Sequence, residues 1–294
     1  MSNTLFGVEN RSRHSGLTDI RKGENMPTVP KKVYERLVAG IKQFQPILSA
    51  AKSRDVNEAD TVTIVKDMLA DIFGYDKYSE VTSEFSIRGN YCDLATKLNG
   101  AIATLIEVKA IGLDLKDQHV KQAVDYAANQ GVDWVLLTNG MIWRVYRIQF
   151  TKPIEQELVV DVNFSNLNHK SERDIELLYL WCKEGWVRSV LGDYHSHKQA
   201  LSRYVLGAVI LTDPVLDVIR RELRRLSPDA RIDTEEIKFA LVGDVLKREI
   251  LDGEKADEAK KKISRAANSA LRAKAVKDEQ QSAPVIATPG TETP

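Results

Sequence analysis

The sequence contains few cysteines and no long apolar run, and both absences exclude classes of protein. Cys92 and Cys182 are far apart and form no Cys-x-x-Cys pair, which argues against a structural zinc site and fits a reducing cytosol. No stretch approaches the roughly 20 consecutive apolar residues of a membrane span. The first ten residues lack a basic start followed by an apolar core. We therefore expect a soluble, cytoplasmic protein that makes no membrane contact.

The sequence also lacks net charge, because 42 basic residues balance 42 acidic ones. A protein without a global positive field is poorly suited to coating DNA, so any affinity for nucleic acid must come from a local patch. A hydrophobic fraction of 43% is typical of globular proteins. The composition thus leaves open an enzyme with one basic groove.

The most informative stretch is a predicted β-hairpin. Two extended runs flank Asn99-Gly100, a dipeptide that favours a tight hairpin turn. Because strand side chains alternate, Glu107 and Lys109 point to the same face, and Asp93 lies on the partner strand. A buried ion pair would repay its desolvation poorly, whereas a metal site beside an ammonium group would use these charges. The alternative is a surface hairpin with ordinary charges.

These residue types suit phosphodiester chemistry. Two converging carboxylates form the hard-oxygen site that Mg²⁺ prefers. A neighbouring lysine can orient or deprotonate an attacking water, or stabilise charge on phosphorus.

Two helices are predicted before the hairpin. The first starts near Pro30, and we expect Pro46 to bend or interrupt it. The second is capped by Asn57 and ends near Phe73-Gly74. Glu58 stands at the head of its apolar stripe, which indicates either a first-turn acid that complements the helix dipole or a third carboxylate over the hairpin.

After the hairpin, Lys116 to Gln130 is predicted to form one helix. Gln118, Gln122 and Tyr126 follow each other at spacings of four, opposite the packing face. This side is either solvated or lines a ligand cleft beside the metal. A strand, an Asn-Gly turn and a second strand follow, and Trp134 and Trp143 are predicted to belong to the core. From Asn57 the predicted order is helix, three strands, helix, two strands.

The remaining chain is predicted to be helical. The periodic segments are Asp174–Leu191, Lys198–Leu211, Pro214–Leu226, Ile232–Ile250 and Glu254–Lys277. Arginines 220, 221, 224 and 225 cluster on one side of the third helix, where they either contact the DNA backbone or promote solubility. His195 and His197 have no nearby partner ligands, which favours a loop or helix end over a metal site.

Several stretches together carry a family resemblance. The pattern of Asp93, thirteen residues and Glu-x-Lys resembles the active-site motif of the PD-(D/E)xK nuclease superfamily. The wider succession, over about Val33 to Val160, is similar to the N-terminal nuclease domain of type I restriction enzyme R subunits and their stand-alone relatives. Its elements are Asn-Glu-Ala-Asp-Thr (57–61), Phe-Gly-Tyr-Asp (73–76), Asp93, Ile-Glu-Val-Lys-Ala (106–110), Gln122 with Tyr126, and Leu-Thr-Asn-Gly (137–140) followed by Trp143.

The resemblance implies a fold and a set of roles. The fold is a restriction-endonuclease-like α/β (α+β) core, with a central mixed sheet flanked by helices. Asp93 and Glu107 would hold Mg²⁺, for which Mn²⁺ substitutes, with Glu58 supporting the metal. Lys109 would position the attacking water, and Gln122 and Tyr126 would organise the substrate or the site.

The sequence departs from the family in two ways. Leu94 follows the aspartate where an aromatic residue is frequent, a change that we expect to preserve the chemistry. The sequence also has no Gly-x-x-x-x-Gly-Lys-Ser/Thr phosphate loop, so we expect no ATP-driven motor after the nuclease-like domain.

The interpretation is a metal-dependent DNA endonuclease, a magnesium-dependent deoxyribonuclease, acting in restriction or defence against foreign DNA. The alternative is a non-catalytic or partner-activated scaffold with the same fold. A protein partner or a second copy would bind through the helical C-terminal half. The expected segments are a disordered tail (1–26), the nuclease-like domain (27–164), an all-α domain (165–252), and a Lys/Ala-rich helix with a disordered tail (253–294).

Overall fold

The chain divides into two compact units, which are described separately. A computed structural model describes residues 28–87 and 90–281, so the expected tails at 1–26 and beyond 281 lie outside the described residues. The sheet unit is Met1–His195 and the helical unit is Ser196–Pro294. The expected boundary at residue 164 does not coincide with this division, because Ile175, Leu178 and Trp181 belong to the same core as the sheet.

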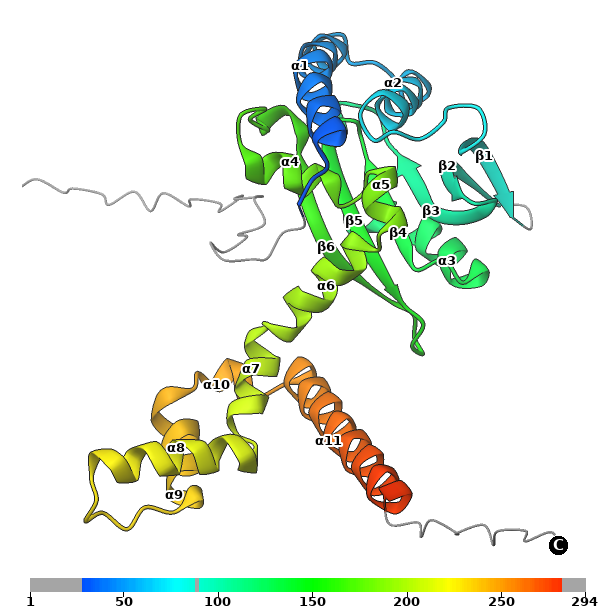
Figure 1. The fold of residues 1–294 in the computed structure, drawn as a ribbon. Helices are drawn as coiled ribbons and strands as arrows, with labels where there is room; N and C mark the ends of the chain where they lie inside the picture. The colour runs from blue at the N-terminus through cyan, green and yellow to red at the C-terminus, as the bar shows by residue number, and fades with distance from the viewer. Residues whose placement is uncertain (1–27, 88–89, 282–294) are drawn as a thin grey trace, which may run out of the picture. The chain divides into compact units, whose positions relative to one another are not determined.

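The sheet unit is built on a six-stranded mixed sheet (Figure 1). Its strands follow one another in sequence order, and only β3 and β4 are parallel, with α3 (Lys121–Gln130) crossing between them. This confirms the predicted mixed sheet flanked by helices. The strands are β1 (Val81–Ile87), β2 (Asn90–Leu98), β3 (Ala101–Val108), β4 (Trp134–Thr138), β5 (Ile142–Gln149) and β6 (Glu155–Asn163).

The last strand, β6, was not predicted from the sequence. It pairs antiparallel with β5 along its whole length and forms one edge of the sheet. The apolar pattern that would predict this strand is short, because the run Leu158 to Val162 contains Asp161 and is buried at three positions only. The pairing with β5 supplies the hydrogen bonds that define the strand.

The predicted hairpin is present between β2 and β3. Asn99 and Gly100 form its turn with φ angles of 51° and 80°, a left-handed conformation that asparagine and glycine adopt at low cost. The register shifts between Thr96 and Lys97, because β3 carries one extra residue there, Ala103. Leu94 pairs with Ile106. Register therefore places the preceding residue of β2, Asp93, opposite Glu107.

The helices α1 (Lys31–Ser53) and α2 (Glu58–Asp71) cover one face of the sheet. Pro46 does not interrupt α1, since the helix continues through it to Ser53, and a bend there stays a prediction. The helix loses a hydrogen bond there, but the buried side chains on both sides of the proline, Phe44 and Leu48, hold it against the core. The predicted cap of α2 is confirmed, because the Asn57 side chain accepts a hydrogen bond from the Asp60 amide at 2.9 Å.

Two hydrophobic clusters lie on opposite faces of the sheet. The larger cluster contains α1, α2 and the aromatic side chains of Phe73, Trp143 and Trp181. Trp134 and Trp143 are both buried, as predicted, and Trp143 meets the Phe73 ring edge-on at 5.1 Å. The smaller cluster joins α3 to the other face through Ala123, Val124, Tyr126 and Ala127.

Shorter helices replace the first long helix expected in the C-terminal half. Helix α4 (Glu172–Tyr179) packs against α1, and α5 (Lys183–Val187) and α6 (Val190–Ala200) follow (Figure 1). The chain turns after Tyr179, and Ser189 has a left-handed φ of 57°, which ends α5. The expected single helix over Asp174–Leu191 is therefore wrong in its extent.

The helical unit contains the remaining helices. Their bounds are α7 (Arg203–Ile210), α8 (Asp213–Leu226), α9 (Thr234–Ala240), the π-helical turn η3 (Leu241–Val245), α10 (Arg248–Leu251) and α11 (Glu254–Gln281). This confirms the expected all-α region, although the segment 232–250 is broken into three pieces. In the part of the chain that the structure describes, no helix is long and apolar enough to cross a membrane.

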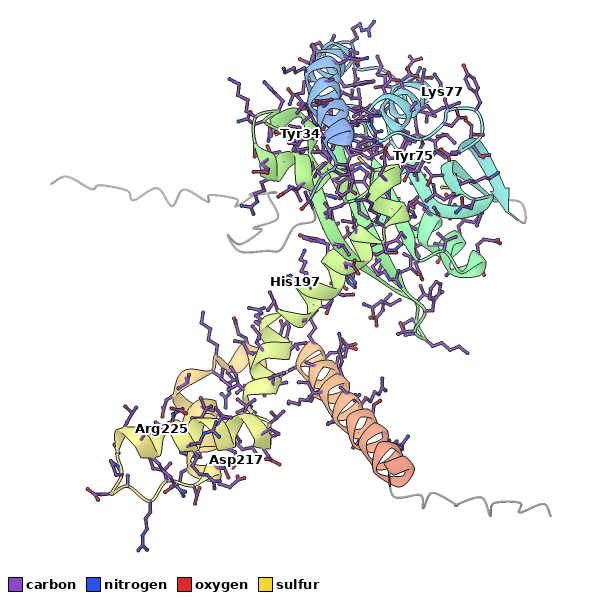
Figure 2. The ribbon with its side chains drawn as sticks, viewed as in Figure 1. Tyr34, Tyr75, Lys77, His197, Asp217 and Arg225 are labelled. Atoms are coloured by element: carbon purple, nitrogen blue, oxygen red, sulfur yellow. The ribbon has the colours of Figure 1, made fainter. Side chains whose placement is uncertain are left out.

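The predicted basic stripe lies on α8 with acidic partners beside it. Figure 2 labels Asp217 and Arg225 on this helix. Arg220 pairs with Asp217 at 2.8 Å, and Arg225 pairs with Glu222 at 2.9 Å. These contacts reduce the net positive field of the stripe, and a DNA contact there stays a prediction.

Candidate active site

The sheet brings Asp93, Glu107 and Lys109 together at one end of β2 and β3. Glu107 and Lys109 are two residues apart, at the end of β3, and Asp93 is across from Glu107 on β2. They lie on the face that α3 covers, since the neighbouring residues Ala95 and Leu105 belong to the α3 cluster. The predicted shared face of these three residues is thus present.

Glu107 is the most deeply buried of the charged groups. Its residue is 6% exposed, and its Oε1 accepts a hydrogen bond from Lys109 Nζ at 2.7 Å. Its Oε2 is buried and has no hydrogen-bond partner among the described residues. A buried carboxylate oxygen without a partner is costly, so this atom marks a position where a ligand would be stabilised.

Asp93 and Glu58 flank this pair in different ways. Asp93 Oδ2 accepts a hydrogen bond from the Val108 amide at 2.7 Å, which fixes its carboxylate against β3. Glu58, in the first turn of α2, approaches Lys109 Nζ to 3.5 Å, and its side chain is 48% exposed. Glu58 therefore points from the first turn of α2 toward Lys109.

Burial penalises the charge on both carboxylates of the site. Desolvation raises the pKa of Asp93 and of Glu107, and Glu58 raises both further. For Lys109, desolvation lowers the pKa, but its bond to Glu107 and the three nearby carboxylates outweigh this, so the net pKa is raised. The lysine is therefore a stable ammonium at neutral pH, while the two carboxylates are held in a place that penalises their charge.

The donor set fits Mg²⁺ bound in an open site. Among the described residues, no cluster of three or more His, Cys, Asp or Glu side chains is arranged to hold a metal ion. Glu58 pairs with Lys109 instead of joining the two carboxylates as a third ligand. Mg²⁺ commonly uses one or two carboxylates and keeps waters and substrate phosphates as its other ligands. Glu107 Oε2, buried and without a partner, suits such a site.

The helix after the hairpin differs from the prediction. A 3₁₀ turn, η1 (Asp117–His119), precedes α3, so Gln118 is outside the helix that carries Gln122 and Tyr126. Because a 3₁₀ turn has about three residues per turn, it changes the direction of Gln118 relative to Gln122. Tyr126 is only 4% exposed and packs in the α3 cluster, which corrects its predicted position opposite the packing face. Gln118, Gln122 and Tyr126 nevertheless line one groove of about 340 Å³.

Other side chains hold the segment between Lys109 and η1, and the sequence did not reveal them. Asn139 Nδ2 donates to the Leu113 carbonyl at 3.0 Å, and Arg144 Nη1 donates to the Leu115 carbonyl at 2.9 Å. Tyr146 donates from its hydroxyl to Asp117 at 3.2 Å. The alternation of β5 could have placed Arg144 on this face, but its partners are distant in sequence.

The two histidines do not form a metal site with each other in the described structure. His195 lies inside α6, contacts Glu157 at 3.0 Å and meets the Trp134 ring edge-on at 5.9 Å. His197 follows two residues later in the last turn of the same helix.

Comparison with known proteins finds a resemblance over part of the chain. Residues 64–162 match the family described as type I restriction enzyme R protein N terminus. The match covers about a third of the chain and includes Asp93, Glu107, Lys109, Gln122 and Tyr126. No curated protein and no solved structure matches the chain.

The matched segment thus resembles the N-terminal domain of type I restriction enzyme R proteins, and the mixed sheet flanked by helices is consistent with that resemblance.

Proposed function

We propose that the protein is a Mg²⁺-dependent DNA endonuclease of the PD-(D/E)xK type. The observation that carries the proposal is Glu107, whose Oε2 is buried without a partner beside Lys109 and opposite Asp93. This arrangement lies inside the segment that resembles a restriction enzyme domain. A sheet needs no such arrangement for its stability, whereas hydrolysis of a phosphodiester uses each part of it.

Asp93 and Glu107 would hold the metal, and Mn²⁺ would substitute for Mg²⁺. When bound, the ion would polarise the phosphodiester and neutralise charge that develops on its oxygens. The Val108 amide fixes the orientation of Asp93, and the Lys109 ammonium fixes that of Glu107. Such fixed carboxylates need little reorganisation on binding. Glu58 would support the site through Lys109 and through waters.

Lys109 would orient the attacking water and stabilise negative charge on phosphorus. Its raised pKa favours these roles over proton abstraction, because an ammonium group has no free electron pair. The water would attack phosphorus in line with the leaving oxygen and release a proton to solvent, and the bond to the leaving oxygen would break as that oxygen takes up a proton from solvent. Gln122 and Tyr126 would organise the substrate from the α3 groove, which they line with Gln118.

The direct test is cleavage of supercoiled, linear and single-stranded DNA with Mg²⁺ or Mn²⁺. We expect metal-dependent cutting by the wild type, and a loss of at least about a hundredfold in Asp93→Asn, since one lost ligand removes several kcal/mol of charge stabilisation. Asparagine keeps an acceptor for the Val108 amide. Asp71→Asn, an exposed change at the end of α2, is the matched control and should cut normally.

The outcome also separates the alternative function. Equal cutting by Asp93→Asn and wild type would remove Asp93 from the site. No cutting by the wild type at high enzyme concentration would contradict an endonuclease that acts alone and favour a non-catalytic or partner-activated scaffold. The biological role that we propose is restriction or defence against foreign DNA in the cytoplasm.

A further inference from the structure

The helical unit buries little of its own apolar surface. Among its described residues, the buried large apolar side chains are Leu216 and Ile237, and two alanines, Ala256 and Ala259, are buried with them. A region of this size with so small a core gains little from folding alone. Other large apolar side chains of the unit are exposed: Leu201, Leu206, Val209, Val218, Leu226, Phe239, Val242 and Val245.

Two of the exposed side chains, Phe239 and Leu226, have neighbours of opposite charge. Phe239 is 81% exposed and lines a shallow groove with Val242 on α9 and η3. Glu235 and Glu236 form the acidic part of the groove lining, with Lys238 as the single base. Leu226, 80% exposed, ends α8 and follows Arg224 and Arg225 directly.

These two features are complementary in shape and in charge. One is an apolar side chain next to two arginines, and the other is an apolar groove next to two glutamates. Helices α8 and α9 contact each other within the unit, so the same helix pair carries both features. A protein with both halves of a complementary contact can bind a second copy of itself through a two-fold axis, because the apolar side chain of each copy meets the groove of the other.

We propose that the protein forms a symmetric dimer in which the end of α8 of one copy enters the α9 groove of the other. Leu226 would pack on Phe239 and Val242, and Arg224 and Arg225 would face Glu235 and Glu236. Within one copy Arg225 pairs with Glu222 at 2.9 Å, and Glu236 accepts a hydrogen bond from the Asp233 amide at 3.1 Å, so these exposed side chains would add the second contact or exchange partners on dimerisation. The charges decide the occupant: a DNA strand would be repelled by the acidic groove, whereas a second copy brings the matching arginines. The proposal does not depend on the nuclease activity.

The first arm of the test measures the mass of the full chain by sedimentation equilibrium over a range of concentrations. We expect the wild type to reach twice the mass of one chain. Phe239→Glu should weaken the dimer by at least tenfold in dissociation constant, because it places a charge in the apolar groove. Phe150→Glu is the matched control, since Phe150 is also exposed, at 51%, but lies after β5 in the sheet unit. It should leave the dimer unchanged.

The second arm exchanges the charges. The double variants Arg224→Glu/Arg225→Glu and Glu235→Arg/Glu236→Arg should each be monomeric, since like charges would then face each other. Mixed together they should form a heterodimer, because each contact regains opposite charges. Circular dichroism of each variant checks that its helices are kept. A wild type that stays monomeric, or double variants that fail to associate when mixed although both are folded, would overturn the proposal.

Discussion

Glu107→Gln is expected to lower metal-dependent DNA cleavage by about a thousandfold or more while the fold is kept. The glutamine has the same shape and its carbonyl still accepts the hydrogen bond from Lys109, so packing is unchanged. It removes the negative charge that would hold the metal, and several kcal/mol of lost charge stabilisation correspond to this factor. The substitution removes the negative charge from the buried Oε2 position.

The same substitution should not destabilise the protein. Desolvation raises the pKa of Glu107 in the folded state above its ordinary value, so stability falls as pH rises through the interval between these two values. At neutral pH the ionised glutamate therefore costs stability, and the neutral glutamine removes that cost. Thermal unfolding without metal should give an equal or higher Tm for Glu107→Gln at about pH 7, with the gain vanishing below the ordinary glutamate pKa of about 4.3.

Glu155→Gln, at the exposed start of β6, is the matched control for both measurements. It should retain cleavage and Tm. Full cleavage by Glu107→Gln would mean that Glu107 holds no essential cation, and a large drop in its Tm would mean that the carboxylate stabilises the fold instead.

Gly185→Ala is expected to destabilise the sheet unit by about 2–4 kcal/mol. A Cβ atom on Gly185 would collide with the backbone carbonyl oxygen of Tyr179. Tyr179 and the residues that follow it, Leu180 and Trp181, are fully buried, so the backbone has no free space into which to move. For a unit of this size, such a loss lowers Tm by about 5–15 °C.

Gly192→Ala provides the contrast. Gly192 lies in α6, and a Cβ there would meet no atom within 4 Å. Alanine should stabilise that helix by about 0.5 kcal/mol, because glycine loses more backbone freedom on folding. Calorimetric scans of the two variants should therefore shift in opposite directions. Equal shifts would show that the turn after Tyr179 relaxes easily.

Local patterns predicted the positions of the three candidate site residues better than they predicted the surrounding helices. Strand alternation and the Asn99-Gly100 turn fix the shared face of Asp93, Glu107 and Lys109, because both depend on neighbouring residues only. The cap at Asn57 is local in the same way, and it determines where Glu58 starts α2.

Tertiary contacts decided the features that the sequence did not reveal. Tyr126 follows Ala123 by three residues within α3, so its side chain lies at the margin of the packing face and is covered there. The break after Tyr179 depends on close contact with Gly185, and β6 depends on pairing with β5. The hydrogen bonds that hold the segment between Lys109 and η1 join residues about 30 positions apart, such as Arg144 and Leu115. No local periodicity contains that information.

Calorimetric titration of the metal-free protein with Mg²⁺ tests the central claim most directly, because it measures the carboxylate site without relying on turnover. We expect saturable binding to the wild type, and binding at least tenfold weaker to both Asp93→Asn and Glu107→Gln, with Asp71→Asn unchanged. Equal binding by all four proteins, or none by the wild type up to millimolar Mg²⁺ with and without DNA, would contradict it.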